Sequence, residues 1–164
     1  MTDRAARSGT ESPVIGAKAP DFTLPVAGGG EIALRDFAGR VLVLYFYPRA
    51  DTSGCTKEAL DFSRLKAAFA RAGADILGVS TDPITTLDAF KKKYKLTVAL
   101  ASDETHRTIE AYGAWQNKSM YGRTFMGVVR STFLIGADRR VARIWPKVSV
   151  AHHAQDVLET AKAH

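Results

Sequence analysis

Residues 41–71 read VLVLYFYPRADTSGCTKEALDFSRLKAAFAR and carry the clearest strand-to-helix pattern in the chain. Residues 41–47 are all apolar and stop at Pro48, which predicts a buried central strand. After a loop over residues 49–54, apolar side chains recur at helical spacing until Gly73. This pattern predicts an amphipathic helix with an inward stripe of Leu60, Phe62, Leu65 and Phe69. A strand that leads through a loop into a helix is typical of an α/β sheet.

Strand and helix patterns alternate along most of the remaining chain. Residues 22–24 and 31–34 are short extended segments around the glycines at 28–30, and they predict an N-terminal β-hairpin. Asp82 is the predicted N-cap of a helix that starts at Pro83. Further strands are predicted at 74–80, 96–101, 131–136 and 141–145, and further helices at 83–94, 104–112 and 152–163. The order predicts a thioredoxin-like α/β fold, in which helices flank a central mixed β-sheet with an N-terminal β-hairpin extension.

The length of 164 residues fits one domain. We expect a flexible N-terminal tail over residues 1–14 and a single thioredoxin-like domain over residues 15–164. The longest apolar run has seven residues, against the ~20 that span a bilayer, and the first sixteen residues contain no apolar signal segment. No membrane association is therefore expected, and the cytoplasm is the expected location.

The composition also bears on metals and nucleic acids. A single cysteine excludes an internal disulfide, a C-x-x-C pair and a multi-cysteine metal site, and the four histidines lack ligand spacing. The net charge of +6 comes from dispersed basic residues, with a run only at residues 91–93. Because these lysines suit the C-terminus of a helix, they need no nucleic-acid partner. We expect no metal, no cofactor and no nucleic acid.

The single cysteine, Cys55, lies at the predicted start of the helix. The helix dipole stabilises a thiolate there, and the thiolate is the reactive form of cysteine. Thr52 and Ser53 can cap the first turn, and Gly54 allows close approach of the backbone. Asp51 is expected to face solvent, because a carboxylate directed at the sulfur would oppose its ionisation. The same position also suits an inert, buried cysteine, so position alone leaves both interpretations open.

The residues around Cys55 carry a family resemblance. Residues 48–55 resemble the peroxiredoxin signature Pro-x-x-x-Thr-x-x-Cys. The wider chain is similar to the bacterioferritin-comigratory, or Q-type, branch of that family. The matching pieces are APDFTL at 19–24, GVS at 78–80, YGAW at 112–115 and YGRTFMGVVRSTFLI at 121–135. The resemblance implies a thiol-specific peroxidase that reduces hydrogen peroxide and organic hydroperoxides.

The resemblance also implies four catalytic residues. The Cys55 thiolate attacks a peroxide oxygen and becomes a sulfenic acid. Arg130 carries a permanent charge that stabilises the thiolate and the charge on the peroxide oxygens. The Thr52 hydroxyl orients the peroxide, and Pro48 limits the access of water to the sulfur.

One position departs from the Q-type pattern. Many members carry a resolving cysteine five residues after the first, where this chain has Leu60. A one-cysteine variant needs an external thiol, which could come from thioredoxin, glutaredoxin, glutathione or the Cys55 of a second subunit. We expect a monomer or a weak homodimer.

Two other functions remain as alternatives. One is a redox-inert or peroxide-sensing thioredoxin-fold module that binds partners. The other is a Cys–His hydrolase, although no histidine lies in a segment expected near Cys55. Outside the four catalytic positions, Arg123 is expected to be solvated, and packing near the mouth of the active-site pocket is expected for Trp115, Tyr121, Phe125 and Met126.

Overall fold

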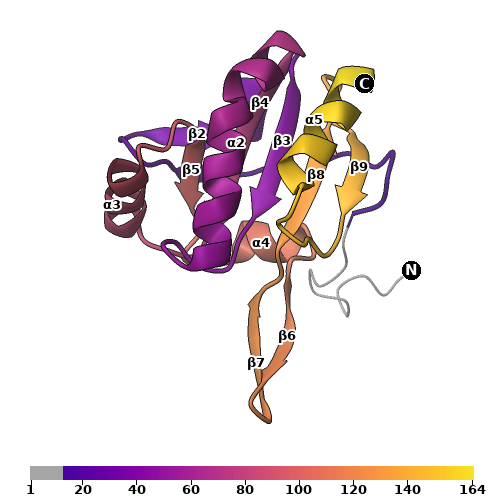
Figure 1. The fold of residues 1–164 in the computed structure, drawn as a ribbon. Coiled ribbons are helices and arrows are strands. Elements are labelled where there is room, and N and C mark those ends of the chain that lie inside the picture. Colours follow the sequence, from indigo (N-terminus) through magenta and orange to yellow (C-terminus); the bar gives the residue numbers. More distant parts are fainter. Residues whose placement is uncertain (1–12) are drawn as a thin grey trace, which may run out of the picture.

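The computed structural model describes residues 13–164 and is built on a five-stranded mixed sheet (Figure 1). The strand order is β5-β4-β3-β8-β9. β3 runs parallel to β4, which runs parallel to β5, whereas β8 is antiparallel to both β3 and β9. The bounds are β3 Val41–Phe46, β4 Ala74–Ser80, β5 Ala99–Ser102, β8 Ser131–Ile135 and β9 Val141–Trp145. The predicted thioredoxin-like α/β fold is confirmed. The predicted tail, apart from its last two residues, lies outside the described part of the chain.

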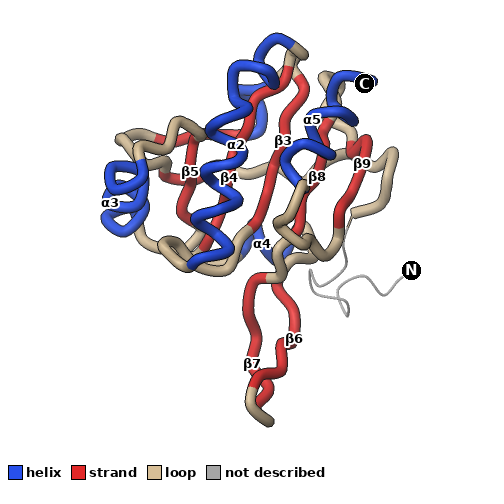
Figure 2. Tube along the Cα trace, viewed as in Figure 1, coloured by secondary structure: helices blue, strands red, loops and turns tan. Residues whose placement is uncertain are grey.

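Helices cover the sheet, and alternate side chains of β3 enter two separate cores. Val43 and Tyr45 pack in the core under α2 (Ser53–Arg71) and α5 (His153–Ala163). Leu44 and Phe46 pack in the opposite core, with residues of α4 (Arg107–Ala111). α2 and α5 lie side by side on one face of the sheet (Figure 2).

The remaining helices are α3 (Ile84–Tyr94) and the 3-10 helix η1 (Leu34–Phe37). Within residues 13–164, no helix has the length and apolar character needed to cross a membrane.

The predicted N-terminal hairpin is confirmed. β1 (Thr23–Pro25) pairs antiparallel with β2 (Glu31–Ala33). The three glycines at 28–30 all have positive φ, between 78° and 109°, in the turn between these strands. Glycine is needed there because other residues rarely adopt this backbone conformation.

A second hairpin was not predicted. β6 (Trp115–Met120) pairs with β7 (Arg123–Val128) and projects from the body of the molecule (Figure 1). Its turn residues, Tyr121 and Gly122, both have positive φ, the signature of a type I′ turn. Tyr121 is therefore 95% exposed at the tip, and Phe125 and Met126 are also exposed. The expectation that Tyr121 packs near the pocket mouth was wrong, because its side chain is almost fully exposed.

Four further sequence predictions need correction. Leu60 is 41% exposed and does not belong to the core, because two helical residues rotate it about 160° away from buried Phe62. Asp82 does not cap α3: Pro83 is the N-cap, and the Asp82 carboxylate accepts hydrogen bonds from Ala50 N–H and the Ser80 hydroxyl. The helix predicted over 104–112 is limited to α4, and the strand predicted over 96–101 is β5.

Candidate active site

The end of β3 and the start of α2 position the cysteine. β3 leads through Pro48 to Thr52, the N-cap of α2, and Cys55 lies in the first helical turn with only 1% of its surface exposed. The Thr52 carbonyl accepts the Thr56 N–H at 2.8 Å, which starts the helix. The predicted cap position is correct, but no side chain caps the helix. The Thr52 hydroxyl instead donates to the Arg49 carbonyl at 2.8 Å.

Arg130 contacts the sulfur although it is 75 residues away in the sequence. It directly precedes β8, the antiparallel neighbour of β3. Its Nη2 donates a hydrogen bond to Cys55 Sγ at 3.3 Å. A β-carbon at Gly54 would lie 3.1 Å from the same nitrogen, so this close approach depends on glycine. The structure therefore brings Cys55 and Arg130 together, as the sequence resemblance implies.

Glu58 completes this cluster and was missed from the sequence. It lies one turn after Cys55 on the same face of α2, and its Oε1 accepts a hydrogen bond from Arg130 Nη1 at 2.6 Å. The side chain is 1% exposed, and its Oε2 has no hydrogen-bond partner among the described residues. Burial raises the pKa of Glu58 to about 7, although the attraction of Arg130 opposes this rise. The signal available in the sequence was a carboxylate three residues after a cysteine on one helix face.

The Arg130 guanidinium stays charged despite its partial burial. Burial alone lowers the pKa of Arg130, but the charges of Glu58 and Cys55 more than offset it and raise the pKa above its usual value. One nitrogen of the guanidinium donates a hydrogen bond to the Glu58 carboxylate, and another donates one to the Cys55 sulfur. A fixed positive charge beside a cysteine stabilises the thiolate, so the cluster is suited to nucleophilic chemistry at sulfur.

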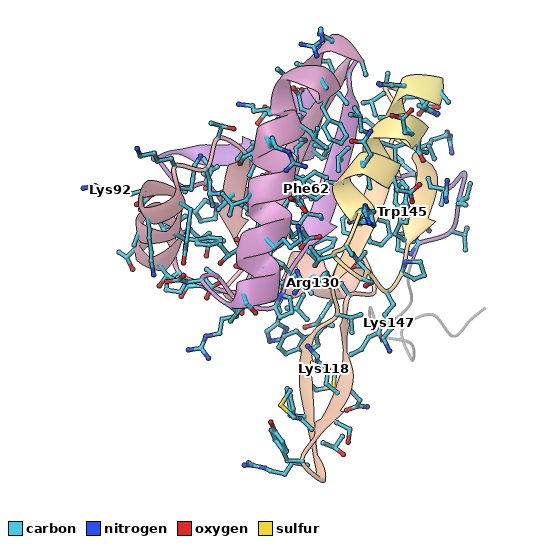
Figure 3. The ribbon with its side chains drawn as sticks, in the orientation of Figure 1. Phe62, Lys92, Lys118, Arg130, Trp145 and Lys147 are labelled. Carbon is cyan, nitrogen blue, oxygen red and sulfur yellow. The ribbon has the colours of Figure 1, made fainter. Side chains whose placement is uncertain are left out.

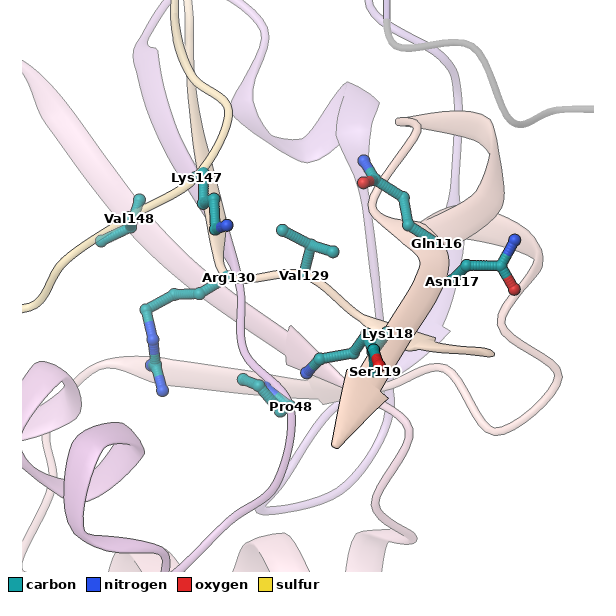
Figure 4. Close-up of a pocket in the computed structure, with 9 residues that line it drawn as sticks. All are labelled: Pro48, Gln116, Asn117, Lys118, Ser119, Val129, Arg130, Lys147 and Val148. Atoms are coloured by element: carbon teal, nitrogen blue, oxygen red, sulfur yellow. The ribbon is translucent and has the colours of Figure 1, made fainter. Parts of the chain in front are cut away.

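A pocket of about 460 Å³ opens beside this cluster (Figure 4). Pro48 and Arg130 form part of its wall, so two of the four predicted catalytic residues line one cavity.

The exposed Asp51 carboxylate accepts hydrogen bonds from the Tyr94 hydroxyl and the Lys93 ammonium group. These hydrogen bonds lower the pKa of Asp51. The prediction that Asp51 faces solvent is confirmed, as is the exposure of Arg123.

One histidine approaches the site more closely than the sequence suggested. His153 of α5 packs edge-on against Phe62, which shares a core with Cys55. Burial, with a smaller contribution from Arg130, lowers the pKa of His153 to about 4. Its Nε2 forms a 2.8 Å hydrogen bond with the Thr132 hydroxyl, and within residues 13–164 no hydrogen bond joins it to Cys55. This arrangement does not make a Cys–His nucleophilic pair.

Comparison with known proteins agrees with the fold. Residues 15–144 match the AhpC/TSA family. Peroxiredoxin Bcp of Bacillus subtilis is 42% identical over 148 residues, which cover 90% of this chain and 94% of the relative. Peroxiredoxin Bcp of Escherichia coli K12 is 38% identical over 89% of this chain and 94% of the relative.

Solved structures give the same result. The bacterioferritin comigratory protein of Xanthomonas campestris superposes with a TM-score of 0.86 at 41% identity, over 92% of this chain and 99% of that chain. A cysteine variant of PrxQ from Xylella fastidiosa gives a TM-score of 0.89 at 35% identity, over 94% of this chain and 98% of that chain. The fold and the site define a thiol-dependent peroxidase. The chain belongs to the AhpC/TSA family, as a one-cysteine peroxiredoxin of the Bcp, or Q-type, branch.

Proposed function

We propose that Cys55 is the peroxidatic cysteine and that it reduces hydrogen peroxide and organic hydroperoxides. The observation that carries this proposal is the hydrogen bond from Arg130 Nη2 to Cys55 Sγ in the first turn of α2. The bacterioferritin comigratory protein of Xanthomonas campestris is described as having alkyl peroxide reduction activity, which supports the same substrate class here.

Each of the four predicted residues has a separate role in the reaction. The Cys55 thiolate attacks one peroxide oxygen, so that an S–O bond forms, the O–O bond breaks, and water or an alcohol leaves after taking up a proton. Arg130 stabilises the charge on the departing oxygen. The Thr52 hydroxyl, which donates to the Arg49 carbonyl, keeps lone pairs that can accept a hydrogen bond from the peroxide. Pro48, in the wall of the adjacent pocket, shields the sulfur from bulk water.

The second half of the cycle needs a thiol from outside the chain. Cys55 is the single cysteine, and Leu60 stands where many relatives carry a resolving cysteine. Two equivalents of a small thiol, or one dithiol of the thioredoxin class, would return the sulfenic acid to the thiol. We infer that residues 15–164 carry out this cycle as one domain, as a monomer or weak homodimer. A cytoplasmic setting, which keeps thiols reduced, would supply the reductant.

The test is intact mass spectrometry with a sulfenic-acid trap after one equivalent of hydrogen peroxide. The wild type should gain one trap adduct at Cys55, and Cys55→Ser should gain none. Added thiol should then restore the starting mass and support repeated peroxide consumption. A protein that forms no adduct would instead be the redox-inert binding module. One that forms the adduct but is not recycled by any thiol would be a peroxide sensor.

A further inference from the structure

The pocket beside Arg130 has a strongly basic lining. Nine residues form it, and none of them is acidic: Pro48, Gln116, Asn117, Lys118, Ser119, Val129, Arg130, Lys147 and Val148. Figure 4 shows the side chains of Lys118 and Lys147 extending into the space near Val129 and Pro48. Lys118 comes from β6, and Lys147 comes from the segment after β9. The pocket therefore brings together cationic side chains from two separate parts of the chain.

Hydrogen bonds tie Lys118 and the segment that carries Lys147 to the site. Lys118 Nζ donates to the Val128 carbonyl at 2.9 Å. A β-carbon at Gly127 would lie 3.0 Å from the Lys118 side chain, so the missing side chain there leaves room for the lysine. Val148 N–H donates to the Arg130 carbonyl at 2.9 Å, which ties the segment carrying Lys147 to the site. Among the described residues, neither lysine forms an ion pair with a carboxylate.

We propose that this pocket binds the carboxylates of a small thiol that reduces the oxidised Cys55. The inference rests on the proposed peroxidase function and specifies its reductant. A volume of about 460 Å³ accommodates a peptide-sized molecule, whereas a folded dithiol protein would have to reach a sulfur that is 1% exposed. Each turnover consumes two thiols whatever the peroxide, so a thiol subsite serves every cycle. Polar and cationic side chains form most of the wall, which suits a hydrophilic anion.

Arg130 connects the pocket to the chemistry. It lines the pocket and also donates to Cys55 Sγ, so a thiol anchored by Lys118 and Lys147 would approach the oxidised sulfur past the Arg130 side chain. The thiol sulfur attacks the Cys55 sulfur, an S–S bond forms, the S–O bond breaks, and the hydroxide leaves as water with the proton of the thiol. A second thiol then attacks the mixed disulfide and releases the oxidised small disulfide and the Cys55 thiolate.

The test compares glutathione with its diethyl ester, which keeps the thiol and masks both carboxylates. The sulfenic acid is first formed with one equivalent of hydrogen peroxide, and its loss is then followed by trapping and intact mass. The wild type should be reduced about tenfold faster by glutathione than by the ester, and 0.5 M salt should shrink this difference. The double variant Lys118→Gln/Lys147→Gln should lose the difference. Lys92→Gln, an exposed lysine on α3 far from the pocket (Figure 3), should keep it.

A binding measurement keeps the inference testable apart from turnover. S-methylglutathione cannot react, and it should bind the reduced wild type more tightly than its diethyl ester does, with the preference lost in the double variant. Equal wild-type rates and affinities for the charged and esterified forms would overturn the proposal. So would a double variant that reacts normally with both thiols but more slowly with a carboxylate-bearing hydroperoxide, since the pocket would then be a peroxide site. Failure of the peroxidase function itself is distinct, because no sulfenic acid would form before thiol is added.

Discussion

Glu58 and Arg130 form a largely buried ion pair, with Oε1 and Nη1 2.6 Å apart and the two side chains 1% and 17% exposed. The same guanidinium donates to Cys55 Sγ. The carboxylate therefore fixes the orientation of the arginine that faces the reactive sulfur. One oxygen of Glu58 has no hydrogen-bond partner among the described residues, and burial raises the pKa of Glu58 to about 7. Keeping the Glu58 carboxylate ionised in this pair therefore costs folding free energy.

Glu58 should make the protein less stable as the pH rises. Its pKa is raised from 4.5 to about 7, so its contribution to the free energy of unfolding is fully present below pH 4.5 and is lost as the pH rises to about 7. Glu58→Gln should remove this decline. Urea unfolding at pH 5 and pH 7.5 measures it, with the exposed Glu159→Gln as the control. A wild type and a Glu58→Gln variant with the same pH dependence would contradict the raised pKa.

His153 should act in the opposite direction. Its pKa is lowered from 6.5 to about 4, so its contribution to stability is present above pH 6.5 and is lost as the pH falls through about 4. His153→Gln keeps a group that can bind Thr132 and should weaken the acid sensitivity between pH 6.5 and pH 4. Urea midpoints across this range measure the effect. The exposed His152→Gln should behave like the wild type.

Arg130→Met should slow the oxidation of Cys55 by hydrogen peroxide by about 10²-fold or more, since it removes a preorganised charge from the sulfur. Arg130→Lys should recover part of the rate but not all of it, because an ammonium group cannot serve Glu58 and Cys55 from two separate nitrogens. Quenched-flow mass spectrometry gives these rates. Arg123→Met on the exposed hairpin is the control, and an unchanged rate in Arg130→Met would remove Arg130 from the catalytic site.

Gly54→Ala should separate activity from stability. Its β-carbon would lie 3.1 Å from Arg130 Nη2 and push the guanidinium away from the sulfur, which should slow peroxide oxidation about tenfold. Stability should change little, because the gain of about 1 kcal/mol from the better helix former is opposed by the disturbed ion pair of Arg130 with Glu58. Ser53→Ala, in the same turn, should leave the oxidation rate unchanged. A normal rate in Gly54→Ala would show that the close approach is not needed.

Leu60→Cys restores the missing resolving cysteine. Five helical residues rise about 7.5 Å, which is beyond disulfide reach, so an internal disulfide requires the first turns of α2 to unwind. Because Leu60 is 41% exposed, the substitution itself should change stability little. Peroxide should produce the disulfide together with a loss of helical circular dichroism. A disulfide that forms with the helical signal intact would contradict the placement of residues 55–60 in a helix.

The sequence supports the central fold well because its buried strands are long and apolar. Residues 41–47 and 74–80 predict β3 and β4 closely. The hairpin of β6 and β7 was not predicted because β6 carries polar residues at 116–119 and does not contribute to the main sheet. The dipeptide Tyr121-Gly122 was the available signal, because a type I′ turn needs positive φ at both residues.

Only part of the site could be predicted from the sequence. Periodicity places Cys55 at a helix start, but only the family resemblance pointed to Arg130, 75 residues away. Glu58 was missed because a charged residue in an amphipathic helix normally faces solvent. The basic pocket depends on a tertiary arrangement that brings Lys118 and Lys147 together, and no local pattern reports that arrangement.

The rate constant for the reaction of hydrogen peroxide with Cys55 is the decisive measurement of whether this cysteine is catalytic. Quenched-flow mass spectrometry would compare the native enzyme with the same chain unfolded in urea and with free cysteine, at one pH. If the cluster of Cys55, Thr52 and Arg130 activates the thiol and the peroxide, the native rate constant should exceed both references by about 10³-fold or more. A native rate constant equal to that of free cysteine would show that this fold holds an ordinary thiol, and the proposed catalytic role of Cys55 would be wrong.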